Sequence, residues 1–157
     1  MWSQWWAGLF GGSPSGRSKA VEILQQQYIE ASQRASHLTQ HAQRMPYAHF
    51  REKLLSIAAE EAKHCDQIAE KLKVFSSPLP KVPETPLVGG NSWQSLLGDL
   101  EEQRRSAAEL WNQLHRIRPE FPEIAEVFQR IYEHGQKHRG EIINMLMRSD
   151  PQAFSAG

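Results

Sequence analysis

Two stretches of this chain carry the same apolar pattern, and this match limits the fold more than any other feature of the sequence. In residues 47–73 and 121–148, apolar residues recur every three or four positions, as they do on the buried face of an amphipathic helix. A shift of 74 residues superposes the two series. The matched positions are Phe50 with Ile124, Leu54 with Phe128, Ile57 with Ile131, Glu61 with Gly135, His64 with His138, Ile68 with Ile142, and Leu72 with Leu146. This internal repeat predicts two related pairs of helices.

The prolines divide the chain into four helical segments, at about 18–43, 47–73, 92–117 and 121–148. Proline is unfavourable inside a helix, so each one indicates a boundary or a first turn. Ser18 and Ser92 are the predicted N-caps. The proline-rich segment 76–91 is long enough to run the length of helices of about 40 Å. The sequence therefore predicts an all-α four-helix bundle with a long crossover between helices 2 and 3.

Length and composition restrict the class of protein. A chain of 157 residues is large enough for one domain with its own core, and a net charge of +0 does not favour nucleic acid as a partner. Cys65 is the only cysteine, and we expect it to be an inert buried thiol. No apolar run approaches the ~18 residues of a membrane span, and the first residues lack the pattern of a secretory signal. We therefore expect a cytoplasmic protein.

The repeat contains polar residues where a helical stripe would be buried. Glu61 and His64 form a Glu-x-x-His, and His138 recurs at the position that matches His64. Residues three apart share a helix face, so both side chains are expected to point inward. A buried carboxylate is costly unless it is compensated, and a metal ion is one compensator. The alternative is a set of core polar groups that bond to one another.

Three stretches resemble the ferritin-like superfamily, in particular the rubrerythrin-like proteins. They are "YIEASQRASHLTQHA", "HFREKLLSIAAEEAKHCDQIAEKL" and "EIAEVFQRIYEHGQKH", which look like the first, second and fourth helices of that family. The resemblance covers residues 18–148. It implies a di-metal site with one glutamate from each of helices 1 and 3 and a Glu-x-x-His from each of helices 2 and 4.

The resemblance implies four ligands in this chain. They are Glu30 from helix 1, Glu61 and His64 from helix 2, and His138 from helix 4. Two ligand positions are lost, because Gln103 stands at the glutamate position of helix 3 and Gly135 at that of helix 4. We therefore expect no metal or one Fe, Mn or Zn ion, and not a di-iron centre.

Nearby acids could replace the lost ligands only if a helix shifted. These acids are Asp99, Glu102 and Glu141. No residue is assigned a catalytic role. His37, His41 and His134 lie near the predicted site, and we interpret them as satisfied core or boundary histidines.

The first residues form a separate feature, "MWSQWWAGLFGGSPSG", which has no charge and holds three of the five tryptophans. Tryptophan favours membrane interfaces and protein hot spots. We expect residues 1–12 to bind a membrane protein complex or a membrane surface, so that the protein is peripheral at the membrane. The alternative is that they fold back on the bundle. The side chains concerned are Trp2, Trp5, Trp6, Leu9 and Phe10.

These features predict three parts: an anchoring segment with its linker (1–17), the ferritin-like bundle (18–148) and a C-terminal tail (149–157). The favoured function is a non-catalytic accessory subunit docked through its N-terminus. The second hypothesis is a metal-dependent protein for iron binding, iron oxidation or peroxide reduction. Iron storage in a shell is a third and less favoured hypothesis, and self-association remains open.

Overall fold

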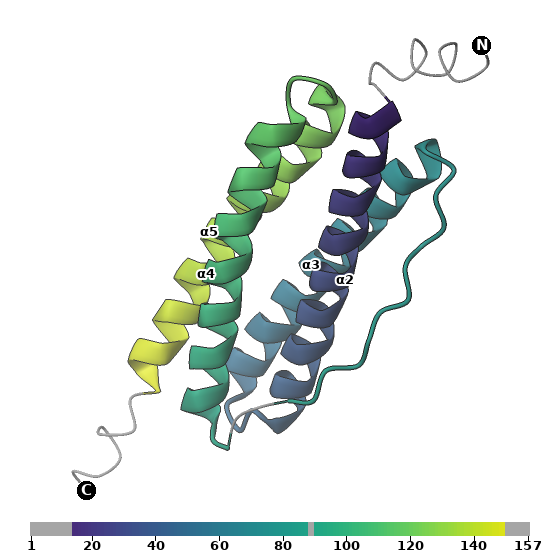
Figure 1. The fold of residues 1–157 in the computed structure, drawn as a ribbon. Coiled ribbons are helices and arrows are strands. Elements are labelled where there is room, and N and C mark those ends of the chain that lie inside the picture. Colours follow the sequence, from purple (N-terminus) through teal and green to yellow (C-terminus); the bar gives the residue numbers. More distant parts are fainter. Residues whose placement is uncertain (1–13, 88–89, 150–157) are drawn as a thin grey trace, which may run out of the picture.

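The computed structural model describes residues 14–87 and 90–149, and these form a bundle of four α-helices (Figure 1). The helices are α2 (Pro14–Arg44), α3 (Ala48–Val74), α4 (Ser92–Ile117) and α5 (Pro122–Arg148). The predicted all-α four-helix bundle is confirmed. The tryptophan-rich residues 1–13 and the tail from residue 150 onward lie outside the described residues.

The observed helix ends differ from the prediction at two N-termini. α2 begins at Pro14, so residues 14–17, predicted as linker, form its first turn. Proline is favourable in a first turn, because the backbone N–H groups there have no partner within the helix and proline has no N–H to leave unpaired. Ser18 lies inside α2 and caps nothing. The N-cap of α4 is Asn91 and not Ser92, because Asn91 Oδ1 accepts from Gln94 N at 2.8 Å while Gln94 Oε1 accepts from Asn91 N at 3.2 Å. This reciprocal pair is a capping box.

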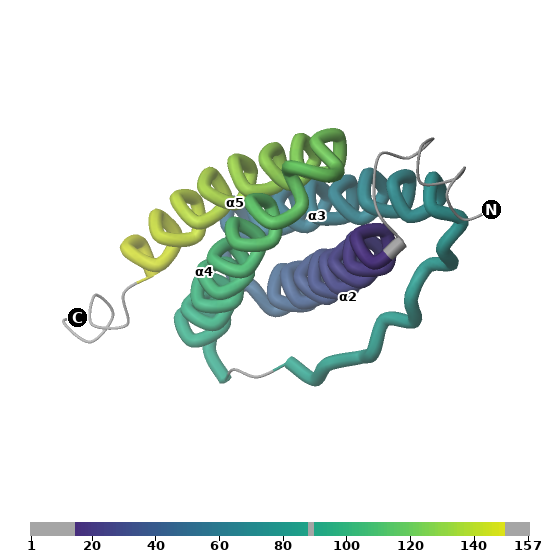
Figure 2. The backbone as a smooth tube through the Cα atoms, turned by 45° about the horizontal axis from the view of Figure 1, so that its top comes forward, coloured from purple at the N-terminus to yellow at the C-terminus, as the bar shows by residue number. Residues whose placement is uncertain are grey.

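The bundle consists of two helix pairs, α2 with α3 and α4 with α5, joined by contacts of α2 with α4 and of α3 with α5 (Figure 2). Every member of the repeated series is buried except Leu146, which is partly buried. The 74-residue repeat therefore corresponds to α3 and α5, the two helices whose stripes face the bundle interior.

The apolar core is divided into two clusters. One contains Leu24, Leu72, Leu114 and Phe128, and the other contains Leu38, Leu54, Leu100 and Ile142; each cluster includes residues from all four helices. Most of the buried residues between them are polar, with Ala31 and Gly135 as small residues among them. The predicted site residues lie in this polar layer at the middle of the bundle.

The connection from α3 to α4 follows the outer side of α2 as far as Leu87 (Figures 1 and 2). Side chains of α2 hold it in place along this path. The contacts are Gln25 Nε2 to Ser77 Oγ at 3.2 Å, Gln33 Nε2 to the Pro83 carbonyl at 3.1 Å, and His37 Nε2 to Thr85 Oγ1 at 2.6 Å.

None of the helices in the described part of the chain combines the length and the apolar character that crossing a membrane requires.

Candidate functional site

The predicted ligands come together at the middle of the bundle. Glu61, His64 and His138 are 1–2% exposed, as the stripe pattern predicted, whereas the side chain of Glu30 is 26% exposed. Gln103 and Gly135 are buried beside them. The sequence therefore placed all six positions in one region, although Glu30 lies at its edge.

Glu61 is the centre of a dense set of polar contacts. Arg34 Nε and Nη2 each donate to Glu61 Oε2 at 3.2 Å, and Gln103 Nε2 donates to Glu61 Oε1 at 3.3 Å. His138 Nδ1 lies 3.4 Å from Oε1, and His64 Nδ1 lies 3.5 Å from Oε2. Each carboxylate oxygen of Glu61 thus accepts from a neighbouring helix, Oε2 from Arg34 of α2 and Oε1 from Gln103 of α4, and each also lies beside a histidine ring.

The charge state of Glu61 follows from these contacts. Burial by itself would raise the pKa of the carboxyl group, but the charge of Arg34 and the histidines His138 and His64 hold that pKa well below its usual range. A buried carboxylate is stable only when it is paired in this way. Glu61 is therefore an anion whose counter-charge comes from an arginine.

Arg34 also connects Glu61 to Glu30. Its Nη1 donates to Ser106 Oγ and lies 3.8 Å from Glu30 Oε2. Ser106 Oγ in turn donates to Glu30 Oε2 at 2.9 Å. The guanidinium group of Arg34, a residue only 5% exposed, therefore lies between the two carboxylates that the family resemblance assigns to metal.

A second arginine lies against Gly135. A Cβ atom at Gly135 would be 3.4 Å from Arg139 Nη1 and 3.9 Å from Gln103 Oε1. Arg139 Nη1 is buried and has no hydrogen-bond partner among the described residues. Between these groups lies a cavity of about 20 Å³, which has room for roughly one water molecule.

The acids that could have replaced the lost ligands are engaged elsewhere. Asp99 pairs with His41 and Glu102 pairs with His37, whereas Glu141 forms an ion pair with Lys53 at 3.4 Å. None of them reaches Glu61. The described residues contain no group of three or more His, Cys, Asp or Glu side chains arranged to hold a metal ion as they stand.

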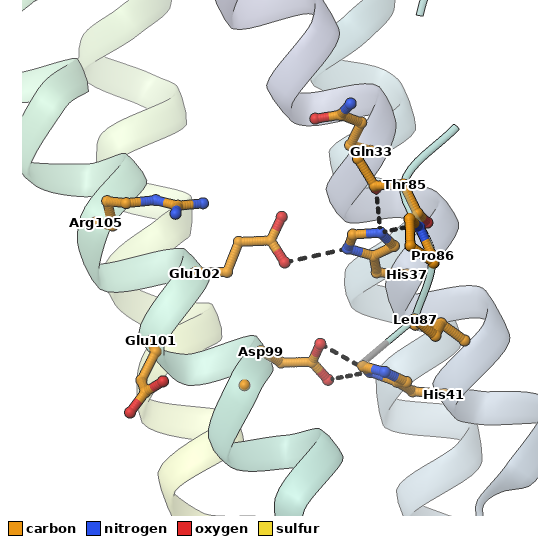
Figure 3. A pocket seen from close by; sticks show the side chains of 11 residues that line it. Gln33, His37, His41, Thr85, Pro86, Leu87, Asp99, Glu101, Glu102 and Arg105 are labelled. Carbon is orange, nitrogen blue, oxygen red and sulfur yellow. Dashed lines mark hydrogen bonds and ion pairs between the residues drawn. The ribbon is translucent and has the colours of Figure 1, made fainter. Parts of the chain in front are cut away.

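A separate polar pocket of about 410 Å³ lies between α2, α4 and the connection (Figure 3). His41 Nδ1 bonds to Asp99 at 2.8 Å, while His37 lies between Glu102 Oε2 at 3.3 Å and Thr85 Oγ1 at 2.6 Å. Burial raises the pKa of Asp99, and its bond to His41 offsets only part of that effect. His37 and His41 thus bind α4 to α2. His41 is only partly satisfied, because its Nε2 is buried without a hydrogen-bond partner among the described residues.

Two further pairs link α3 and α5 on the side of Glu61 that faces solvent. His64 Nε2 lies 3.0 Å from His134 Nδ1, and His138 Nε2 lies 2.6 Å from Glu60 Oε2. Burial by itself would lower the pKa of His138, but Glu61 and Glu60 raise it above its usual value. Burial would raise the pKa of Glu60, but His138 lowers it. Glu60 was not among the residues predicted from the sequence.

Three further residues of this centre were not predicted from the sequence: Arg34, Ser106 and Arg139. Arg34 follows Glu30 by four residues, which places both on one face of α2, and that spacing was the available signal. Its length allows the guanidinium to reach the bundle centre while its Cα stays on α2.

We compared the chain with models of known protein families and with curated protein sequences and found no match.

Proposed function

We propose that this protein is a ferritin-like bundle in which an arginine has replaced the metal centre, and that it serves as a non-catalytic accessory subunit. The single observation that carries the proposal is the position of Arg34 between Glu61 and Glu30. The connection along α2 supports the ferritin-like assignment, since that fold has one long crossover.

The residues at the centre do not fit a pair of metal ions. Two ions in a carboxylate-bridged site lie about 3.5–4 Å apart and need open carboxylate oxygens. Here the oxygens of Glu61 accept from Arg34 and Gln103, and the remaining space is about 20 Å³. An arginine keeps its charge at physiological pH, so Arg34 would repel a divalent cation. This argues against the alternative hypothesis of a metal-dependent oxidase or peroxidase.

Iron chemistry tests this part of the proposal. Tag-free, full-length protein is mixed with Fe²⁺ in air, and oxygen consumption and bound iron are measured beside a Glu30→Gln variant. We expect no binding of an iron pair and no oxygen consumption that depends on Glu30. Uptake of two irons per chain that Glu30→Gln abolishes would overturn the proposal.

A variant that restores the family's ligands sharpens this test. Arg34→Ala/Gln103→Glu/Gly135→Glu removes the counter-charge and returns the two lost carboxylates. We expect iron binding to appear in this variant and to be lost again on adding Glu61→Gln. Circular dichroism verifies that each variant is helical, and the wild-type measurement stands independently of whether they fold.

The role as a docked subunit is supported by the residues before the bundle. Trp2, Trp5 and Trp6 lie in an uncharged segment ahead of α2, and tryptophan is enriched at interface hot spots and at membrane surfaces. We propose that residues 1–12 bind a membrane-associated protein complex and keep the protein at the membrane periphery.

Deletion of residues 1–12 is the corresponding experiment, with Trp2→Ala/Trp5→Ala/Trp6→Ala as the matched point variant. Both should move the protein from the membrane fraction to the soluble fraction while leaving its melting temperature unchanged. An unchanged distribution would contradict docking. A lower melting temperature would instead show that the segment folds back on its own bundle.

A further inference from the structure

Arg139 places one N–H without a partner inside the bundle. The residue follows Gly135 by four positions on α5, so the two are neighbours on one helix face. Its guanidinium carbon lies 5.9 Å from the centre of the Tyr132 ring, and this cation–π contact holds the side chain in place. The Nη1 atom is buried and has no hydrogen-bond partner among the described residues. A buried N–H that stays unpaired is costly, so we expect a further group to bind there.

Gln103 presents an acceptor to the same place. Its Nε2 donates to Glu61 Oε1 at 3.3 Å. Because Glu61 is an anion, the amide nitrogen must face it, and the amide oxygen Oε1 is then left for another donor. Within the described part of the chain, no donor reaches this oxygen. A Cβ atom at Gly135 would lie 3.9 Å from Gln103 Oε1 and 3.4 Å from Arg139 Nη1, so the glycine lies beside both groups.

The cavity that these residues line has the size and the polarity to hold one water molecule. Its volume is about 20 Å³, and a water needs about 10–15 Å³ and two to four polar partners. Arg34 and Arg139 line the cavity and would repel a cation. The carboxylate of Glu61 and the amide oxygen of Gln103 would repel an anion. A small neutral ligand that accepts one hydrogen bond and donates another satisfies both groups.

We propose that one ordered water molecule binds at this place, where it accepts from Arg139 Nη1 and donates to Gln103 Oε1. Gln103 and Gly135 stand at the two positions where the family resemblance implies glutamate, so the water fills space that the lost carboxylates would take. The site also accounts for a glycine inside α5 despite its cost relative to alanine, because a side chain at this position would displace the water. The inference goes beyond the proposed role as a docked subunit, and neither depends on the other.

A crystal structure of the tag-free, full-length protein tests the site directly. We expect one peak of electron density at hydrogen-bond distance, about 2.7–3.2 Å, from both Arg139 Nη1 and Gln103 Oε1. Crystals soaked in bromide should give no anomalous signal at that peak. The proposal is wrong if the wild type shows no peak there. It is also wrong if bromide produces an anomalous peak, because the ligand would then be an anion.

Two glycine variants of α5 provide a matched test in solution. A Cβ atom added at Gly140 would have no described neighbour within 4 Å, whereas at Gly135 it would lie beside both partners of the water. Gly140→Ala should raise the melting temperature by about 2–4 °C, because alanine favours the helix. Gly135→Ala should instead lower it by about the same amount, because the displaced water leaves a buried N–H unpaired. An increase in Gly135→Ala like that of Gly140→Ala would show that the cavity is dry and would overturn the proposal.

The Gln103→Leu background separates loss of the water from crowding of Arg139. This variant removes the acceptor and leaves the arginine in place. In this background Gly135→Ala should raise the melting temperature, because no bound water remains to be displaced. If Gly135→Ala lowers the melting temperature equally with Gln103 and with leucine at that position, crowding is the cause and the proposal is wrong. The wild-type crystal structure stands independently of whether the variants fold.

Discussion

At the scale of single residues, Arg34 determines the charge balance of the bundle centre. Removal of one partner from a buried ion pair leaves an uncompensated charge and typically costs about 3–5 kcal/mol. We therefore expect Arg34→Met to lower the free energy of unfolding by that amount, measured by urea denaturation at neutral pH in the presence of a chelator. Glu61→Gln in the same chain removes the orphaned charge, so the double variant should be more stable than Arg34→Met. If the losses in unfolding free energy of Arg34→Met and Glu61→Gln simply add in the double variant, the two side chains do not interact as the structure indicates.

The pKa of the Cys65 thiol provides a second test of the charges around Glu61. Burial, followed by the negative charge of Glu61, raises the pKa of the Cys65 thiol from 9.0 to about 11. Only the thiolate reacts rapidly with disulfide reagents, and two pKa units correspond to about 100-fold less thiolate near pH 8. The reaction with Ellman's reagent should therefore be about that much slower in the native protein than in urea, and its rate should increase up to about pH 11.

Glu61→Gln is the informative variant for this measurement, because it removes the charge next to the thiol without deleting a side chain. It should lower the pKa of Cys65 and accelerate the reaction below pH 10. Equal rates in the native and unfolded wild type at neutral pH would mean that the thiol is not shielded.

The residue scale also shows where sequence reasoning stops. The helical period placed Glu61, His64 and His138 in the core, because period and burial are directly related. It gave no such information for Arg34. Arginines on a helix usually extend to solvent. Only the contacts with neighbouring helices, to Glu61 of α3 and Ser106 of α4, show that this one turns inward. The loss of two ligand positions was predicted from the sequence. The position of Arg34 beside Glu61 could be found only in the three-dimensional structure.

At the scale of helices, α2 and α4 are joined by a ladder of buried polar pairs at intervals of seven residues. Its steps are Gln27 with Gln113, Arg34 with Ser106, and His41 with Asp99. The numbers rise along α2 as they fall along α4, which is the pattern of an antiparallel pair in heptad register. Polar pairs at such positions fix the register, because a shift would leave each group buried without a partner.

The first step of the ladder can be tested by a double-mutant cycle. Gln27 Nε2 donates to Gln113 Oε1 at 2.8 Å, and Gln27 is 1% exposed. Gln113→Leu leaves the Gln27 amide unpaired and should cost about 1–3 kcal/mol. Gln27→Leu/Gln113→Leu should recover much of that loss, because two apolar groups then face each other. The measurement is urea unfolding of the single and double variants, and a double variant less stable than Gln113→Leu would contradict the pairing.

Helix boundaries were predicted less well than helix positions. Asn91 and Gln94 form the capping box of α4 although Ser92 was the residue chosen, since the two are adjacent and both are good caps. The polar ladder was also present in the sequence as residues seven apart in two helices. Its meaning depends on which helices are neighbours, and neither segment contains that information alone.

At the scale of the whole molecule, each apolar cluster includes residues from all four helices. Leu24 and Leu54 are 0% exposed and lie in different clusters, on opposite sides of the polar layer. Neither helix pair can therefore keep its core if the other pair leaves. Despite the polar layer between the clusters, we expect the bundle to unfold as one cooperative unit.

Matched cavity variants test this cooperativity. Leu24→Ala and Leu54→Ala each remove the same three side-chain carbons, one variant from each cluster, and each should cost about 2–5 kcal/mol. Both should lower the melting temperature while preserving a single calorimetric transition whose enthalpy equals the van 't Hoff value. If the polar layer instead isolated the clusters, each variant would split the transition and destabilise only its own end of the bundle. If the calorimetric and van 't Hoff enthalpies agree in each variant, the polar layer around Arg34 joins the two clusters into one folding unit.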